Sequence, residues 1–387
     1  MHKVMRNRIW TCGPIATAGA ALLLGSPARA LSFTPLGDLA GGDANSTAYA
    51  ISNDGSTVVG TSSATLGFEA FRWTQLTTMV TLGDLVGGSN ESAGYATSSN
   101  GSVIAGYGTS ATGSEATTWT GPLYVPPTSL GTLGGANPVS TANGISADGS
   151  VVVGRTSTAS GTEAFMWTSG SGMVTLGDFP TGGTQSTATA ISDNGSVIVG
   201  AGLHAGPVGE AFRWTSGTGL VGLGDLAGGT VDSLALGVSG DGNTVVGQSN
   251  ATNGIEAFVW TVGTGMQGLG DLAGGSFESR ARDASADGSL IVGQSMAADG
   301  AHAVIWSGGN LYDLNVIAAA VLPAGWQLED AFGISSNGLA IVGRANNPDG
   351  NNEAFLLRLD SAPPIPEPTT GALLALGLVA LSIRRPR

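Results

Sequence analysis

Short runs of alternating apolar and polar residues, separated by turn residues, fill most of the chain. Such a period of two is typical of half-buried strands. In the stretch that shows it best, residues 235–238, 244–248, 256–261 and 266–272 are predicted as four strands. Asp241-Gly242 is the two-residue turn that a tight hairpin favours. The 3.6-residue apolar period of an amphipathic helix is absent from this region, so the pattern predicts an all-β fold.

Three motifs recur in a fixed order, seven times each, about every 46 residues. The first is Leu-Gly-Asp-Leu-x-Gly-Gly, which begins at Leu36, Leu82, Leu176, Leu223 and Leu269 and has variants at Leu130 and at residues 312–314. The second is an Asp-Gly or Asn-Gly turn followed by an apolar triplet and glycine, as in residues 54–60. The third is Glu-Ala-Phe-x-Trp at Glu69, Glu163, Glu210 and Glu256, with looser copies at residues 115–119, 302–306 and 353–357.

Four short strands in a unit of this length are typical of propeller blades. The ends of the repeat region are complementary: residues 32–39 read as a fourth strand without its first three, and residues 353–360 as a third strand without a fourth. Their pairing would complete a blade and leave no free edge. We therefore predict a seven-bladed β-propeller over residues 31–360, closed by its N- and C-terminal strands. A right-handed β-solenoid is the alternative, but an open solenoid needs polar caps.

The recurring residues have structural interpretations and functional alternatives. The tryptophans are expected to pack between blades, with sugar-stacking platforms as the alternative. The repeated Asp is expected to accept turn N–H groups, with a bound cation as the alternative. The repeated Glu is expected to be a solvated residue at a strand entrance, and the alternative is an acidic ring that attracts cations. The glycine after each apolar triplet is expected to let neighbouring blades approach closely.

One copy carries an insertion, residues 315–327, between its fourth strand and the next unit. Residues 316–322 are predicted to form one or two helical turns that stop before Pro323. Tyr312 and Trp326 lie beside this insertion, and we interpret it as a tentative binding loop. A cap over the closure seam is the alternative.

The two ends of the chain have the character of targeting segments. Residues 1–30 combine Lys3, Arg6 and Arg8 with an apolar stretch and with Ala28 and Ala30 at the A-x-A positions, so a signal peptide cleaved after Ala30 is predicted. Residues 361–368 form a proline-rich linker, and residues 369–387 an apolar helical segment with an arginine tail. That segment is short for a full membrane span, so it is either a marginal anchor or a transient one held for processing.

The end of the chain resembles the PEP-CTERM sorting signal of Gram-negative bacteria: Pro366-Glu367-Pro368, an apolar stretch, then Arg384 and Arg385. This resemblance implies exosortase as a transient partner, and release to the surface or matrix of bacteria that make exopolysaccharide and biofilm. The three repeated motifs resemble the HAF family of extracellular repeats, with Glu-Ala-Phe here in place of His-Ala-Phe. That resemblance implies an extracellular location and no established activity.

Charge and chemistry narrow the function. Of the 14 basic residues seven lie in the terminal segments, whereas of the 28 acidic residues only Glu367 does, so residues 31–360 carry a net charge of −20. Such a surface repels nucleic acid. The single cysteine, Cys12, lies in the signal segment, and His204 and His302 are the only histidines outside it. We therefore expect no catalytic, cofactor or metal site.

The prediction is a non-enzymatic protein that binds exopolysaccharide or surface proteins, or fills the matrix. A propeller enzyme acting on matrix glycans is the alternative, and would need two carboxylates about 5–9.5 Å apart in a pocket.

Overall fold

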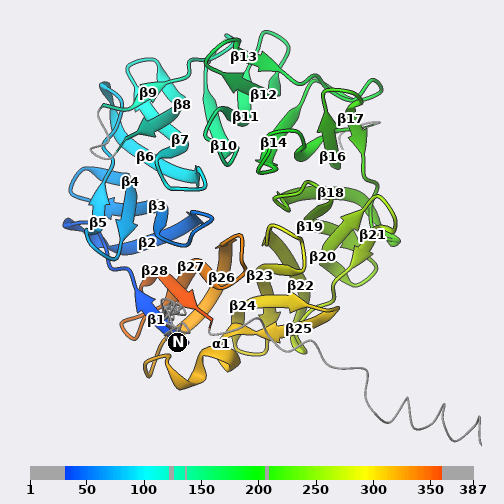
Figure 1. Ribbon diagram of the computed structural model, residues 1–387. Coiled ribbons are helices and arrows are strands. Elements are labelled where there is room, and N and C mark those ends of the chain that lie inside the picture. The colour runs from blue at the N-terminus through cyan, green and yellow to red at the C-terminus, as the bar shows by residue number, and fades with distance from the viewer. Residues whose placement is uncertain (1–30, 122–125, 136, 205–208, 360–387) are drawn as a thin grey trace, which may run out of the picture.

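The computed structural model describes residues 31–121, 126–135, 137–204 and 209–359, which form 28 strands arranged around a central axis (Figure 1). The strands fall into seven antiparallel groups of four, one of which joins the two ends of the described chain. Two of the groups, β18–β21 and β22–β25, are linked by a single parallel pair between Ile255 and Glu278. This is a β-propeller, and the all-β prediction is confirmed. The signal peptide and the C-terminal apolar helix that the sequence predicts lie outside the described residues.

Six groups run outward from the axis in chain order. They are β2 (Gly41–Ile51), β3 (Thr57–Ala64), β4 (Gly67–Thr74) and β5 (Thr78–Thr81); β6 (Gly87–Thr97), β7 (Val103–Ser110), β8 (Gly113–Thr120) and β9 (Thr128–Ser129); β10 (Ser140–Ile145), β11 (Val151–Ser157), β12 (Thr162–Thr168) and β13 (Gly172–Thr175); β14 (Ser186–Ile191), β15 (Ile198–Leu203), β16 (Gly209–Thr215) and β17 (Gly219–Gly222); β18 (Gly228–Val238), β19 (Thr244–Ala251), β20 (Gly254–Thr261) and β21 (Gly265–Gly268); and β22 (Gly274–Ala284), β23 (Leu290–Ala297), β24 (Gly300–Ser307) and β25 (Asn310–Asp313).

The remaining group takes strands from both ends of the chain. It consists of β26 (Gln327–Ile334), β27 (Ala340–Asn346), β28 (Asn352–Arg358) and β1 (Ser32–Pro35). β1 pairs antiparallel with β28, from Ser32 opposite Arg358 to Pro35 opposite Phe355. Figure 1 shows this blue strand beside the orange-red ones.

Element bounds differ by a few residues from the sequence prediction at several strands; for example, the fourth strand expected at residues 266–272 is β21, which ends at Gly268. The inner strand expected at residues 235–238 is the longer β18, because Gly228 still pairs with Ala251 of β19. The helical turns expected at residues 316–322 begin earlier, as α1 (Leu314–Ile317) followed by the 3-10 turn Ala318–Ala320. The Asp313 carboxylate accepts the N–H of Asn315, and this cap fixes the helix start.

The core lies between adjacent blades and is filled from the Glu-Ala-Phe-x-Trp motif. Its phenylalanines are fully buried: Phe71, Phe165, Phe212, Phe258 and Phe355. Trp73, Trp119 and Trp306 are also buried, whereas Trp167, Trp214 and Trp260 are only partly buried against neighbouring clusters. The phenylalanine therefore reaches deeper into the core than the tryptophan that the sequence singled out.

The glycine after each apolar triplet has a different role from the one predicted. A Cβ on Gly247 would lie 2.0 Å from the carbonyl oxygen of Leu234 on the paired inner strand and 2.9 Å from the Phe258 ring. The close approach is therefore between two strands of one blade, not between neighbouring blades.

A repeated serine joins neighbouring blades. The Ser92 hydroxyl accepts the N–H of Ala70, in the preceding blade, and donates to the carbonyl of Gly83. The same pair of bonds is made by Ser46, Ser140, Ser186, Ser233 and Ser279. Each hydroxyl thus satisfies two backbone groups at a blade interface, one of them buried.

Candidate functional site

Each inner strand carries a β-bulge, and the extra residue of the bulge lines the central channel. In β2, for example, Ala48 pairs with Gly60 and Ala50 with Val59, so Tyr49 between them lies outside the pairing register. A bulge redirects a side chain in this way. The seven such residues, which we call the channel ring, are Tyr49, Tyr95, Asn143, Thr189, Leu236, Arg282 and Phe332.

One side of the channel ring is aromatic. Tyr49 lies edge-on to Phe332, with ring centroids 5.3 Å apart, and edge-on to Tyr95 at 5.1 Å. Tyr95 also contacts Tyr107 at 5.9 Å. Burial raises the pKa of all three tyrosines, so their phenols keep their protons at neutral pH. This arc offers apolar ring faces together with hydroxyl groups.

On the other side of the ring Leu236 is apolar, and the three polar residues Asn143, Thr189 and Arg282 bond to the next blade. Asn143 donates to the carbonyl of Ala188 at 2.8 Å, and Thr189 donates to the carbonyl of Ala235 at 2.8 Å. Arg282 binds Asp330 of the next inner strand, and its guanidinium carbon lies 4.9 Å from the centre of the Phe332 ring. These bonds hold the ring side chains in place.

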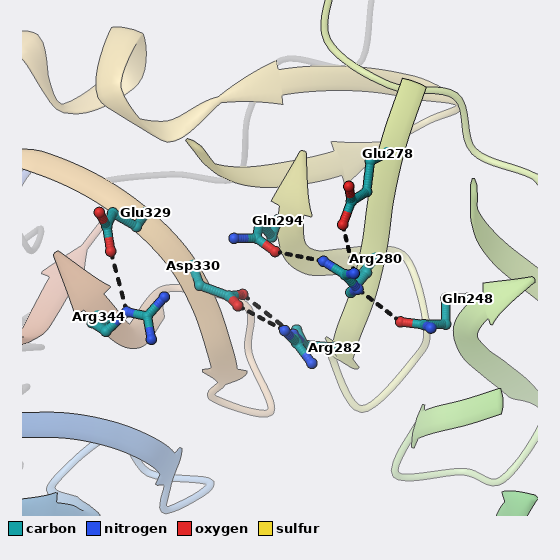
Figure 2. A network of polar contacts seen from close by, with 8 residues as sticks. All are labelled: Gln248, Glu278, Arg280, Arg282, Gln294, Glu329, Asp330 and Arg344. Carbon is teal, nitrogen blue, oxygen red and sulfur yellow. Dashed lines mark hydrogen bonds and ion pairs between the residues drawn. The ribbon is translucent and has the colours of Figure 1, made fainter. Parts of the chain in front are cut away.

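Three arginines near the ring are neutralised by carboxylates (Figure 2). Arg282 donates twice to Asp330, which is 1% exposed. Arg280 pairs with Glu278 at 2.5 Å and also donates to Gln248 and Gln294, as Figure 2 shows. Arg344 pairs with Glu329 at 3.2 Å. From the sequence, Asp283 or Glu278 is the expected ion-pair partner of these two neighbouring arginines. Glu278 does pair with Arg280, whereas the partner of Arg282 is Asp330 of the next inner strand and not Asp283.

The narrow mouth of the channel lies where the turns join first to second strands. Backbone bonds link these turns from blade to blade: Ser99 donates to Ala147, Ala147 to Asp193, and Asp193 to Gly240. Asp241 and Ala286 continue the series by donating to Ala286 and Ser336. The Asn53 amide donates to the Asp193 carboxylate. We call these linked turns the turn belt; the cavity between it and the channel ring measures 190 Å³.

The wide mouth lies on the opposite side of the ring. Its cavity of 390 Å³ is lined by the seven ring residues with Thr141, Thr187 and Arg155. A second cavity of 310 Å³ runs between the β10–β13 and β14–β17 blades and shares Arg155 and Thr187 with the first. The two cavities thus adjoin at Arg155 and Thr187, and we call them together the groove; each is of a size typical for ligand pockets. Among the described residues, no carboxylate lines either cavity.

The sequence-predicted binding loop lies elsewhere. Tyr312 and Trp326 are half-buried and pack against the core cluster at the junction of the chain ends. Trp326 meets Phe33 of β1 edge-on at 5.1 Å. The Asn315 side chain bonds both backbone groups of Leu328, which fixes the insertion to β26. This packing is what a cap over the seam requires, and ligand binding at the insertion stays a prediction.

The repeated acidic residues are engaged in turn contacts. Glu353 accepts the N–H of Gly37, and Glu256 accepts that of Gly270. His302, which replaces Glu in one copy, contacts Asp313 at 2.7 Å. Asp84 accepts both the N–H and the hydroxyl of Thr109. Within the described ranges no group of three or more metal-ligating side chains occurs.

The channel ring and Arg155 were missed by the sequence analysis. A signal for the ring was present, because each ring residue lies 11 positions before the glycine that ends the apolar triplet, as Tyr49 lies before Gly60. Only Tyr49 and Tyr95 share a residue type, and the other five ring residues all differ, so the position does not stand out as a motif.

Comparison with known proteins identifies the end of the chain. A family model described as the PEP-CTERM protein-sorting motif matches residues 364–386, which include Pro366, Glu367, Pro368, Arg384 and Arg385. These residues lie outside the described part of the structure. The chain therefore carries a recognition signal for exosortase, which implies export and transient membrane sorting in a Gram-negative bacterium. A search of curated proteins gives no match. Within the described ranges, no helix has the length and apolarity to cross a membrane.

Solved structures resemble the chain in fold. Prolyl oligopeptidase B from Galerina marginata is 9% identical with a TM-score of 0.51, over 82% of this chain and 50% of that one. The β-propeller domain of the Trilobed protease from Pyrococcus furiosus is 10% identical with a TM-score of 0.47, over 88% and 100%. TolB from Acinetobacter baumannii is 11% identical with a TM-score of 0.47, over 79% and 64%. The chain thus spans about two thirds of that TolB and half of the oligopeptidase.

Proposed function

We propose that this protein is a closed, seven-bladed propeller of the cell surface or extracellular matrix that binds exopolysaccharide without chemically changing it. The sorting signal supports delivery outside the inner membrane. The resemblance of the repeats to HAF extracellular repeats supports the same location. Pairing of β1 with β28 supports ring closure, because it completes one four-stranded group with strands from both ends of the described chain.

The wide mouth carries the binding proposal. It combines an aromatic arc with the hydroxyls of Thr141, Thr187 and Thr189 and the amide of Asn143, in one groove that opens outward along a blade interface. Flat aromatic faces and fixed hydrogen-bonding groups suit a sugar ring, which has both apolar C–H faces and hydroxyl edges. A groove that continues outward from the channel suits a polysaccharide chain better than a single small molecule.

The absence of carboxylates from the described groove walls supports binding over glycoside hydrolysis. A glycosidase commonly needs an acid and a second carboxylate on opposite sides of the bond. Asp193 and Asp283 line the cavity on the narrow side of the channel ring, and Glu278, Glu329 and Asp330 near the ring are each held by an arginine. A protonated acid is disfavoured beside such a cation.

Co-sedimentation tests this function. Full-chain protein would be mixed with exopolysaccharide purified from the producing bacterium, and the pellet and the number of reducing ends would both be measured. We expect the protein in the pellet only with polysaccharide, and no new reducing ends. Protein that stays in the supernatant would refute binding, and new reducing ends would establish the glycan-enzyme alternative.

A further inference from the structure

Arg155 is the cation at the wide mouth that lacks a partner. It lies on β11, is exposed, and makes no hydrogen bond or ion pair with any described residue. Its side chain lines both cavities of the groove, at the point where they meet. Residues 31–360 contain only seven basic residues against 27 acidic ones. Among these seven arginines Arg155 is the exposed one, whereas the other six are half-buried.

Equivalent positions in the other blades hold mostly other residue types, so the blade geometry itself does not call for an arginine here. In strand register, the position of Arg155 opposite Thr141 corresponds to Thr61, Tyr107, Ala201, Gln248, Gln294 and Arg344 in the other blades. Two of these accept a bond from Arg280, and Arg344 is paired with Glu329. The blade of Arg155 supplies only a threonine opposite it, so its guanidinium remains available.

The surroundings of Arg155 favour a saccharide over a simple anion. Thr141 and Thr187 line the same wall, and the charge of Arg155 acts on Tyr95, whose ring belongs to the aromatic arc. A guanidinium presents parallel N–H donors that match the two oxygens of a carboxylate. A sugar whose ring packs on the arc can thus place a carboxylate at Arg155.

We propose that the wide mouth binds an anionic saccharide, one that carries a carboxylate on its ring, with Arg155 as the carboxylate-binding residue. This inference rests on the proposed polysaccharide-binding function and names its ligand class. No covalent step is involved.

Calorimetry with a matched ligand pair tests the inference. The probes are trigalacturonate and its methyl ester, in which each charged carboxylate is replaced by a neutral ester carrying one added methyl group. We expect full-chain protein to bind the acid about tenfold or more tightly than the ester, since bonds to a charged group are stronger than bonds to a neutral one. Arg155→Gln is expected to abolish that preference, because it weakens binding of the acid far more than binding of the ester.

The control is Arg213→Gln, which removes the same charge from β16, outside both cavities. It should keep the wild-type preference, and melting temperatures should show that all variants are folded. Equal binding of acid and ester by the wild type would overturn the inference, as would an unchanged preference in Arg155→Gln or binding of neither probe. If the protein still pellets with exopolysaccharide in any of these cases, the proposed function stands without this ligand class.

Discussion

The two mouths of the channel are built by the same inner strands but from opposite kinds of sequence. At the narrow mouth every blade repeats Ser-x-Asp-Gly or Ser-x-Asn-Gly, in which the serine hydroxyl donates to the Asp or Asn, as Ser52 does to Asp54. At the wide mouth the corresponding ring positions hold Tyr, Asn, Thr, Leu, Arg and Phe. Positions inside the hydrogen-bond ladder repeat because each blade needs the same geometry. Bulge positions lie outside the ladder, so they can differ and form a site.

The largest loss of stability is expected from a substitution at a position that repeats in every blade. Gly247→Ala would place a methyl group 2.0 Å from the carbonyl oxygen of Leu234 and against the Phe258 ring. The strand pair would have to separate, so we expect the free energy of unfolding to fall by about 3 kcal/mol, the upper end for overpacking. Urea unfolding followed by tryptophan fluorescence measures this.

Gly263→Ala in the β20–β21 turn is the matched control. A methyl group there meets nothing within 4 Å, so the change should stay within about 0.5 kcal/mol. Equal losses in the two variants would contradict the role assigned to the repeated glycine.

A second effect concerns the narrow side of the channel. Asp283 accepts the N–H groups of Ala284 and Ile334, and burial raises its pKa to about 6, with a smaller contribution from Asp193. The folded protein therefore binds more protons than the unfolded chain between about pH 4 and 6. The contribution of Asp283 to stability is largest below that window and falls as pH rises through it.

Asp283→Asn should remove this dependence. We expect the difference in unfolding free energy between wild type and variant to change by up to about 3 kcal/mol across the window, in the direction that disfavours the wild type at higher pH. Unfolding curves recorded at about pH 4, 5, 6 and 7, which span the window, give the measurement. A constant difference between the two proteins would show that Asp283 titrates normally.

A substitution at the wide mouth is expected to have the smallest effect on stability and a measurable effect on polysaccharide binding. Tyr95→Leu removes a half-buried ring that contacts Tyr49 and Tyr107. Affinity for exopolysaccharide should fall about threefold to tenfold, the range for one aromatic contact. The free energy of unfolding should change by about 1 kcal/mol or less. A stability loss as large as that of Gly247→Ala would place Tyr95 among the structural residues.

Much of the fold could be predicted from the repeat, because strand alternation, Asp-Gly turns and the buried phenylalanines are local patterns with one physical cause. The channel ring could not be predicted, since a bulge residue follows no alternation and its direction is fixed only by the paired strand. The sequence offers more than one nearby carboxylate as the partner of Arg280, so it does not decide between them. Whether Arg155 has an ion-pair partner depends on the residue opposite it on the paired strand, which the sequence alone does not identify. From the sequence, the insertion is interpreted as a binding loop because it interrupts the repeat. In the structure its Trp326 packs against Phe33 of β1 instead.

Hydrogen exchange with and without exopolysaccharide tests the central claim most directly. Because bound ligand slows local opening, we expect added protection in the segments of the wide mouth, around Tyr49, Tyr95, Thr141 to Asn143, and Arg155. Exchange in the turn belt around Asn53 should be unchanged. Protection confined to residues 312–326, or to the turn belt, would contradict the wide-mouth site.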